Sequence, residues 1–213
     1  MRLLLLGPPG AGKGTLGRTL SRHFGVPHVA AGDIIRDHIA RGTEFGRGVE
    51  AQIALGNFAS DADILYWMSR RLEEPDAAGG YVLDGFPRTV SQAVAFDGVL
   101  DAVLWLNIDE AERQARLAGR LTCPQCGAIY HTASLPPKVR WVCDIDCMAL
   151  MRRPEDDQDE QRQRIYSEVT APLEQFYAAR SLVLPIDASG SPEQVTDRAI
   201  QLLEDRRLAI SRF

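Results

Sequence analysis

The stretch that decides the fold is Leu3-Leu4-Leu5-Leu6-Gly7-Pro8-Pro9-Gly10-Ala11-Gly12-Lys13-Gly14-Thr15. Four leucines bounded by Gly-Pro are typical of a strand buried on both faces, as the strands of a parallel sheet are. The glycines that follow permit positive φ and leave no Cβ in the way, so backbone N–H groups can converge on an anion at the positive end of the next helix. The stretch therefore predicts a strand, a phosphate-binding loop and a helix.

Lys13 and Thr15 add the polar chemistry of this loop. The spacing of Gly7, Gly12 and Lys13 fits the first part of the phosphate-loop pattern, but the hydroxyl expected directly after the lysine comes one residue later. The chain has only two lysines among its 24 basic residues, which favours a site at Lys13 where a planar guanidinium would not serve. The alternative is a Gly/Pro-rich turn that binds nothing.

The composition is that of an ordinary soluble globular protein. The chain has 213 residues, of which 45% are hydrophobic and 25% charged, with a formal net charge of −5. This charge disfavours bulk binding of nucleic acid or of anionic membranes. The N-terminal apolar run is too short for a signal peptide or a membrane span, so we expect a cytoplasmic protein with no membrane partner.

Apolar segments alternate with helical patterns along the chain. Residues 81–84, 102–108 and 182–187 read as further buried strands, and 26–31 as a short extended segment. Such alternation predicts an α/β fold in which helices cover both faces of a parallel sheet, with ligands at the carboxyl ends of the strands. Thr15, Asp84 and Arg88 should therefore lie at one rim.

Asp84-Gly85-Phe86-Pro87-Arg88 is the second stretch that indicates phosphate chemistry. An aspartate that ends a buried strand beside a phosphate loop can hold magnesium through its water shell. Arg88 can bind a phosphate with two parallel hydrogen bonds. A tight Asp-Gly turn without a ligand is the alternative.

Residues 109–120 read as one helix that carries Arg113, Arg116 and Arg120 on one side. Three like charges repel one another unless they are solvated or neutralised by an anion, and for an arbitrary surface helix we expect solvation. Arg152, Arg153, Arg162 and Arg164 stand among acidic residues further on, which fits either a solvent-exposed helix or the neutralisation of phosphoryl charge. His23, His28 and His38 have no evident partner, so surface or satisfied core positions are expected.

The four cysteines all lie within residues 123–147. Cys123-Pro124-Gln125-Cys126 is a zinc-knuckle arrangement, and Cys143 begins a second half. The fourth ligand is open at this point: Asp146 restores the two-residue gap with an oxygen, whereas Cys147 offers sulfur with a wider loop. A structural zinc site that staples a small subdomain is favoured over free thiols.

These motifs together resemble the adenylate kinase family, in its long-lid, zinc-containing bacterial type, over essentially the whole chain. The resemblance rests on Gly7 to Thr15, Ala31-Gly32-Asp33 with Arg36, Asp84 to Arg88 with Gln92, Arg116 to Arg120, the cysteine segment with Tyr130-His131 and Pro136-Pro137-Lys138, and Thr170-Ala171-Pro172-Leu173. The family carries its hydroxyl at the position of Thr15.

The resemblance implies a fold and an activity. The fold is a single P-loop kinase domain over 1–213, three-layer α/β/α with a parallel sheet, an AMP-binding helical insertion at 30–59 and a zinc-stapled lid at 121–156. The activity is reversible phosphoryl transfer from magnesium ATP to AMP, giving two ADP, by a monomer. Two rival interpretations are a kinase with another acceptor base, CMP or UMP, and a nucleotide- and zinc-binding module without turnover.

The resemblance also implies site residues. Catalytic roles fall to Lys13, Arg88, Arg120, Arg153 and Arg164. ATP binding falls to Gly10, Ala11, Gly12, Lys13, Gly14, Thr15, Arg116, Arg120 (against the adenine), Ile129, Tyr130 and Ser191. AMP binding falls to Ala31, Arg36, Asn57, Phe58, Ala59, Gly85, Phe86, Pro87, Arg88, Gln92, Arg153 and Arg164. Magnesium is expected at Asp84 and Thr15 through water, and zinc at Cys123, Cys126, Cys143 and Asp146, with Cys147 as the alternative fourth ligand.

Three positions depart from the family pattern. Ala31 stands where AMP-specific members usually carry threonine, although Gln92 favours AMP. Asp146 falls where some zinc-type members use aspartate, which favours it over Cys147. Arg164 is in register when counted from Arg153, and Arg162 when counted back from Thr170; of the two, we expect Arg164.

Overall fold

The computed structural model describes residues 1–54, 59–96 and 98–210. Its centre is a five-stranded sheet in the order β2-β3-β1-β4-β7, in which every neighbouring pair is parallel. The strands are β1 Arg2–Leu6, β2 His28–Ala30, β3 Tyr81–Asp84, β4 Ala102–Asn107 and β7 Val183–Asp187. The extended segment expected near residue 28 is thus a fifth strand of this sheet.

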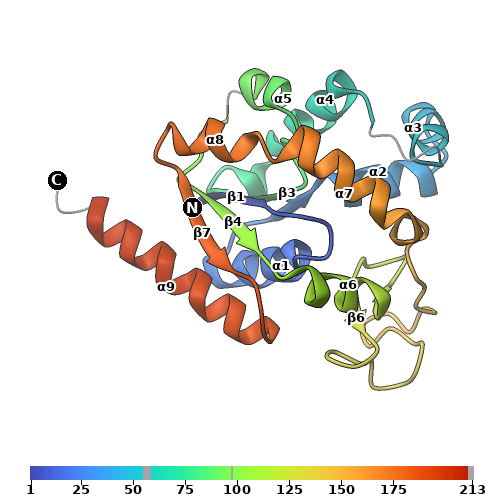
Figure 1. Ribbon diagram of the computed structural model, residues 1–213. Coiled ribbons are helices and arrows are strands. Elements are labelled where there is room, and N and C mark those ends of the chain that lie inside the picture. Colours follow the sequence, from blue (N-terminus) through green and yellow to red (C-terminus); the bar gives the residue numbers. More distant parts are fainter. Residues whose placement is uncertain (55–58, 97, 211–213) are drawn as a thin grey trace.

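Helices cover both faces of the sheet (Figure 1). The α-helices are α1 Lys13–Phe24, α2 Ala31–Ala40, α3 Glu44–Ala54, α4 Asp61–Leu72, α5 Val90–Ala95, α6 Glu110–Ala118, α7 Asp159–Ile165, α8 Leu173–Ala178 and α9 Pro192–Ile210. Short 3₁₀ turns η1 and η2 lie at Pro75–Ala77 and Pro154–Gln158, and a π-helical turn η3 at Tyr166–Thr170. This architecture confirms the predicted three-layer α/β class.

The four leucines of β1 are divided between two cores. Leu4 and Leu6 pack on the face that holds Met68 of α4 and Leu173 of α8, whereas Leu3 and Leu5 pack on the face of α1 and α9. All four are 0–2% exposed. Since successive side chains of a strand point to opposite faces, an unbroken apolar run is what a central strand covered on both sides requires. Full burial of each leucine contributes about 1.5–3 kcal/mol.

β7 contains Pro185, a residue that cannot donate a hydrogen bond to a sheet ladder. Within the part of the chain that the structure describes, the strand pairs only with β4, with Pro185 opposite Trp105, so β7 is an edge strand. An edge strand tolerates proline because one of its sides has no strand to pair with. The strand predicted at 182–187 is therefore confirmed despite its proline.

The single helix predicted over 109–120 is wrong at its end. α6 stops at Ala118, and Gly119 caps it with its N–H on the carbonyl of Ala115, 3.3 Å away. Arg120 instead begins β5 (Arg120–Thr122), which pairs antiparallel with β6 (Ile129–His131). Arg120 therefore does not share a helix face with Arg113 and Arg116.

The segment that follows α6 has a small core of its own. Leu121, Ala128, Tyr130 and Leu150 are buried there together with two of the cysteines, separately from the two cores of the central sheet. A bridge between Thr122 and Met151 closes the segment beside β5. A core this small buries little apolar surface, so a cross-link such as a metal ion would contribute a large share of its stability.

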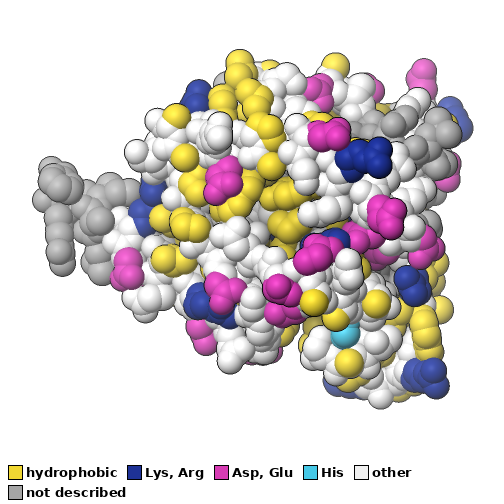
Figure 2. All heavy atoms as spheres, in the orientation of Figure 1, with side chains coloured by type: hydrophobic (Ala, Val, Ile, Leu, Met, Phe, Trp, Pro, Cys, Tyr) yellow, Lys and Arg dark blue, Asp and Glu magenta, His cyan; other side chains and the backbone are white. Residues whose placement is uncertain are grey.

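The surface agrees with the net charge. Acidic side chains are scattered over the face shown in Figure 2, and lysine and arginine form no continuous band on it. Within the described residues, no helix has both the length and the apolar character that crossing a bilayer needs.

Candidate active site

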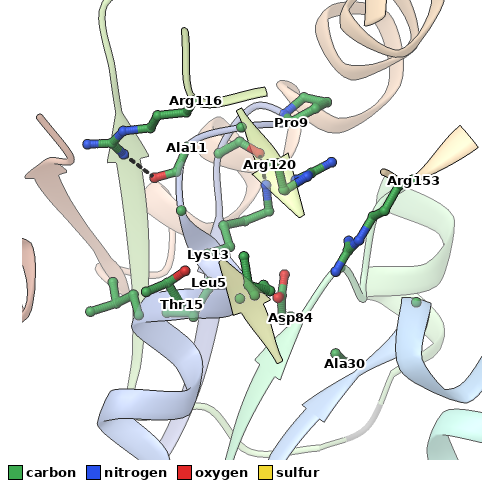
Figure 3. Close-up of a pocket in the computed structure, with 18 of the residues that line it drawn as sticks. Leu5, Pro9, Ala11, Lys13, Thr15, Ala30, Asp84, Arg116, Arg120 and Arg153 are labelled. Atoms are coloured by element: carbon green, nitrogen blue, oxygen red, sulfur yellow. Dashed lines mark hydrogen bonds between the residues drawn. The ribbon is translucent and has the colours of Figure 1, made fainter. Parts of the chain in front are cut away.

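A cavity of about 560 Å³ opens at the carboxyl ends of β1, β2 and β3. This is the edge at which parallel α/β sheets bind ligands. Figure 3 shows Lys13, Asp84, Arg120 and Arg153 directed into it from different elements. The predicted residues that line the cavity are Gly10, Ala11, Gly12, Lys13, Gly14, Thr15, Arg36, Ala59, Asp84, Gly85, Arg88, Arg116, Arg120, Ile129, Tyr130 and Arg153.

The remaining predicted residues lie elsewhere. Ala31, Phe86, Pro87, Gln92, Arg164 and Ser191 are not part of the cavity wall. Asn57 and Phe58 lie outside the described residues.

The glycine loop owes its path to its backbone angles. Gly10 and Gly12 have φ of +86° and +93°, and Gly12 is the residue that precedes the first turn of α1. A Cβ at Gly10 would lie 2.9 Å from the side chain of Leu117, so a larger residue would collide with α6. The first turn of α1 carries no acidic residue. Its N-terminal N–H groups and the helix dipole therefore favour an anion at this point.

Lys13 is held inside the loop that precedes it. Its Nζ donates to the carbonyls of Gly7 and Pro8 at 2.7 and 2.9 Å. Burial lowers the pKa of Lys13 to about 7; Asp84 opposes this shift, whereas Arg88, Arg162 and Arg120 add to it. A phosphate beside this amine would favour its protonated, charged form, so the site favours an anionic ligand.

Asp84 ends β3 beside the first turn of α1. Burial acts to raise the pKa of its carboxyl, but the neighbouring His28 and the charge of Lys13 hold the pKa below its usual range. His28 Nε2 is 3.5 Å from Asp84 Oδ2. Asp84 is therefore ionised at neutral pH, and with the hydroxyl of Thr15 in the same cavity it offers the oxygen ligands that a hard cation prefers.

Asp156 organises two of the cavity's arginines. Its side chain is 1% exposed and accepts from Arg120 Nε at 2.8 Å, from Arg120 Nη2, and from Arg162 Nη1 at 3.1 Å. Pairing with a buried carboxylate fixes the orientation of both guanidinium groups. Asp156 thus holds Arg162 of its own segment and Arg120 of β5 in place.

The structure distinguishes Arg162 from Arg164. Arg162 is part of the cavity wall, whereas Arg164 is exposed and is not. Arg153 joins Arg162 in the wall, with its Nε donating to Thr122 Oγ1 at 2.9 Å. The geometry therefore favours Arg162 over the expected Arg164.

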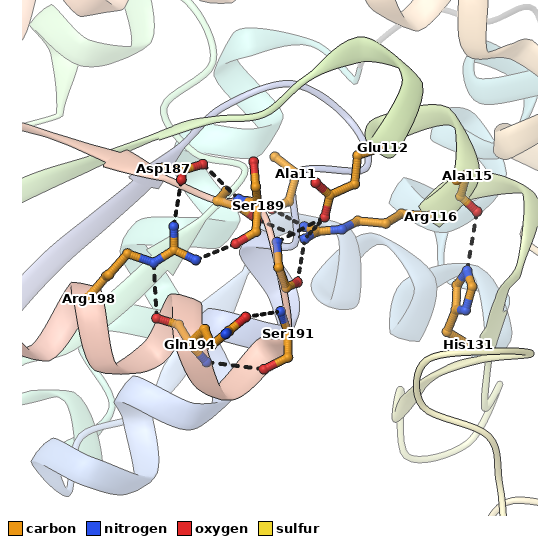
Figure 4. Close-up of polar contacts among 12 residues, drawn as sticks. Ala11, Glu112, Ala115, Arg116, His131, Asp187, Ser189, Ser191, Gln194 and Arg198 are labelled. Carbon is orange, nitrogen blue, oxygen red and sulfur yellow. Dashed lines mark hydrogen bonds and ion pairs between the residues drawn. The ribbon is translucent and has the colours of Figure 1, made fainter.

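Arg116 ties three segments together at the other side of the loop (Figure 4). Its Nη2 donates to Glu112 Oε1 at 2.6 Å and to the carbonyls of Ala188 and Gly190 at 2.8 and 2.9 Å, and its Nη1 donates to Ala11 at 3.3 Å. These four acceptors hold the guanidinium plane against the cavity. Ser191 instead lies directly before α9, where its hydroxyl accepts from the N–H of Gln194 at 3.3 Å.

A second group of arginines lines the cavity from α2 and from the turn after β3. Arg36 pairs with Asp33 on the same helix. Arg88 donates from Nε to the carbonyl of Gly85 at 2.9 Å. The cavity therefore has cations from two separate regions of the chain, which suits a ligand with phosphates at both ends.

Gln92 lies behind this group. It is 3% exposed, accepts from the N–H of Arg88 at 2.7 Å and donates to Asp61 Oδ1 at 2.6 Å. The carboxamide therefore holds the turn that carries Arg88. Ala31 and Phe86 are buried at 3% and 0% exposure.

The cysteine segment forms a cluster with metal-ligand geometry. The ligand atoms of Cys123, Cys126, Cys143 and Asp146 all lie within 4.8 Å of one another. Burial raises the pKa of the Cys126 thiol to about 12 in the absence of an ion, whereas a bound cation would favour the thiolate. Cys147 is exposed and does not belong to the cluster. The placement of Asp146 agrees with its choice over Cys147.

The expectation drawn from the sequence for Arg113 of α6 is wrong. Arg113 was expected in solvent, but its side chain is 2% exposed and pairs with Glu110 at 2.7 Å and Asp159 at 2.6 Å. It also donates to the carbonyl of Pro9 at 3.2 Å, so it braces the glycine loop. His28, expected at the surface or in a satisfied core position, has a side chain that is 9% exposed, with its Nε2 3.5 Å from Asp84 Oδ2. The acidic run that contains Asp159 was the sequence feature that could have indicated a partner for Arg113, but only the fold brings the two residues together.

A strand, a glycine loop and a helix, with cations gathered around one cavity at the sheet edge, define a P-loop phosphotransferase. Comparison with known proteins narrows this class, because the sequence profile of the family described as adenylate kinase matches residues 5–182. The chain belongs to the adenylate kinase family. This confirms the resemblance drawn from its motifs.

Curated relatives match along nearly their whole length. An adenylate kinase of Anaeromyxobacter sp. (strain Fw109-5) is 41% identical over 204 residues, which cover 92% of this chain and 95% of the relative. Those of Streptomyces avermitilis and Kosmotoga olearia are 40% and 38% identical and cover 96% of this chain, with 97% and 100% of their own lengths matched.

Proposed function

We propose that the protein transfers a phosphoryl group reversibly from ATP to AMP, giving two molecules of ADP. One observation carries this proposal: a single cavity is lined by the glycine loop with Lys13 and by the separate pair Arg36 and Arg88. One polyphosphate site alone needs no second set of arginines on another part of the chain. Membership of the adenylate kinase family supports the same reaction.

The chain's own groups suit the chemistry. Phosphoryl transfer needs alignment and charge neutralisation more than it needs a covalent nucleophile. The loop N–H groups and Lys13 would hold the donor phosphates, and Arg36 and Arg88 the acceptor phosphate. Arg120, Arg153 and Arg162 would neutralise the charge that develops on the transferred group. Arg162 takes the role expected of Arg164, because it lines the cavity and shares Asp156 with Arg120.

Magnesium fits the donor site. Asp84 and Thr15 line the cavity with oxygen atoms, and Asp84 is kept ionised by its surroundings. They would hold the ion through its waters, and the ion would neutralise charge on the phosphates.

Zinc fits the cysteine cluster, since three sulfur atoms and one carboxylate oxygen gather within 4.8 Å. The ion would cross-link residues 121–156, which we propose as a lid. We propose residues 30–59 as the acceptor-binding insertion. Together the two segments would exclude water, which would otherwise hydrolyse ATP.

A coupled assay of AMP, CMP, UMP and GMP with magnesium ATP tests the proposal. AMP should be the fastest acceptor. Absence of turnover with every acceptor would support the non-catalytic nucleotide- and zinc-binding module instead. Faster turnover of CMP or UMP than of AMP would show that Ala31 outweighs Gln92 in the choice of base.

A further inference from the structure

Arg18 connects the helix of the glycine loop to the cysteine knuckle. It lies on α1 and donates from Nη2 to the carbonyl of Gly127 at 2.7 Å, with a longer contact from Nη1 to the carbonyl of Cys126 at 3.5 Å. The two carbonyls belong to the turn that presents Cys126 to the metal cluster. A cation on the core thus touches the knuckle at its metal-binding turn.

Asp33 extends this contact to the acceptor side of the cavity. Arg18 Nη2 is 3.6 Å from Asp33 Oδ2, and Asp33 Oδ1 accepts from Arg36 Nη2. Arg18, Asp33 and Arg36 all line the cavity. The carboxylate of Asp33 therefore faces one arginine held by the knuckle and one arginine assigned to the acceptor phosphate.

Gly127 shows how closely the three parts meet. Its φ is +68°, and its N–H donates to the carbonyl of Cys123 at 3.1 Å, so its conformation belongs to the knuckle turn. A Cβ at this position would lie 2.9 Å from Arg18 Nη2 and 3.7 Å from Asp33 Oδ1. The knuckle backbone, Arg18 and Asp33 therefore form one contact, and a shift of the knuckle must move Arg18.

We propose that Arg18 is a positioning residue that couples the two nucleotide sites. When the knuckle lies over the donor site, Arg18 is held by Gly127 and favours the position of Asp33 that holds Arg36 ready for the acceptor phosphate. Each nucleotide then strengthens the binding of the other, since such coupling is reciprocal. This inference rests on the proposed function for the identity of the two ligands.

The test measures the dissociation constant of AMP by calorimetry, with and without a saturating non-hydrolysable ATP analogue. The ratio of the two constants is the coupling. In Arg18→Met the ratio should fall by about fivefold or more, within the range typical of coupled sites, because the AMP affinity falls more in the presence of the analogue than in its absence. Arg18→Lys, which keeps one charged donor, should retain part of the ratio.

Arg22→Met is the matched control. Arg22 lies one turn further along α1, is exposed, and its Nε donates to the backbone carbonyl of Arg18 at 3.3 Å. This variant should keep the wild-type ratio. Because Arg18→Met could disturb the helix, Gly127→Ala provides a second test from the knuckle side, and it should lower the ratio as well.

Two results would overturn the inference: a wild-type ratio of about one, or an unchanged ratio in Arg18→Met, which is also what an equal loss of AMP affinity with and without the analogue gives. Such an equal loss would mean that Arg18 has a purely structural role. The measurement involves no turnover. A lack of phosphotransfer in the wild-type assay would therefore reject the proposed function on its own, separately from the result on coupling.

Discussion

Nucleotide binding should bring a proton onto Lys13. Burial lowers the pKa of this amine to about 7 in the ligand-free protein, with the nearby arginines adding to the shift and Asp84 opposing it. At pH 8 the amine is then only about 10% protonated. The phosphates of ATP favour the charged form, because an anion within a few ångströms raises the pKa of an amine.

The size of the effect follows from this pKa. Full protonation in the complex means an uptake of about 0.9 proton at pH 8 and about 0.1 proton at pH 6. ATP binding should therefore weaken as the pH rises through the ligand-free pKa of Lys13 near 7, by up to about tenfold per pH unit above that pKa. The carbonyls of Gly7 and Pro8 accept from either form of the amine, so they do not remove the effect.

Calorimetric titration of ATP in buffers with different ionisation enthalpies measures the uptake directly. Lys13→Arg is the control: its guanidinium stays protonated, so the only remaining pH dependence is that of ATP and of other groups. An uptake in the wild type that equals the control at both pH 6 and pH 8 would refute the reasoning, since Lys13 would then be charged before the ligand arrives.

Three further predictions concern the fold, the arginines and the metal. Leu4→Ala should lower the free energy of unfolding by about 2–5 kcal/mol, as measured by denaturant titration, because Leu4 is fully buried; a loss below about 1 kcal/mol would contradict its core position. Arg162→Met should lower kcat at least about a hundredfold and Arg164→Met less than about threefold in the coupled assay; the reverse order would restore Arg164. A chelator should lower the melting temperature and release about one zinc per chain by elemental analysis; an unchanged melt of metal-free protein would argue against the zinc site.

The parts of the fold that the sequence predicted are those governed by local pattern. The leucine run, the glycine loop and the strand that ends at Asp84 each show their structure within a few residues. The helix over 109–120 failed because its periodicity continues past Gly119, where the backbone turns into β5. A single glycine can sit inside a helix or end it, and the pairing with β6 that decides the matter is not local.

The charged partners were harder to predict because they come from far along the chain. Asp159 lies 46 residues after Arg113, and Asp156 lies 36 residues after Arg120. The three like charges on one side of the predicted helix made solvation the default for Arg113. Burial of an arginine needs carboxylates at hydrogen-bond distance, and only the packed structure supplies them.

The choice between Arg162 and Arg164 shows a limit of assigning residues by counting along the sequence. Counting from Arg153 and counting back from Thr170 disagree by two residues, and the π-helical turn at Tyr166–Thr170 lies within that interval. The count across this turn, back from Thr170, is the one that gives Arg162, whereas the count from Arg153, which gives Arg164, crosses the 3₁₀ turn η2 at Pro154–Gln158 instead. The side chain that meets Asp156 and the cavity then has to be found from contacts.

The net negative charge of the chain does not conflict with phosphate binding, because several acidic residues form ion pairs with the arginines of the cavity. Arg120 and Arg162 share Asp156, Arg36 pairs with Asp33, and Arg116 pairs with Glu112. Before a ligand binds, the carboxylates offset repulsion among cations crowded into one cavity and fix their orientation. Preorganised cations need little rearrangement when phosphate charge develops, which is what makes such groups effective. Asp33, Glu112 and Asp156 therefore serve the anion site instead of opposing it.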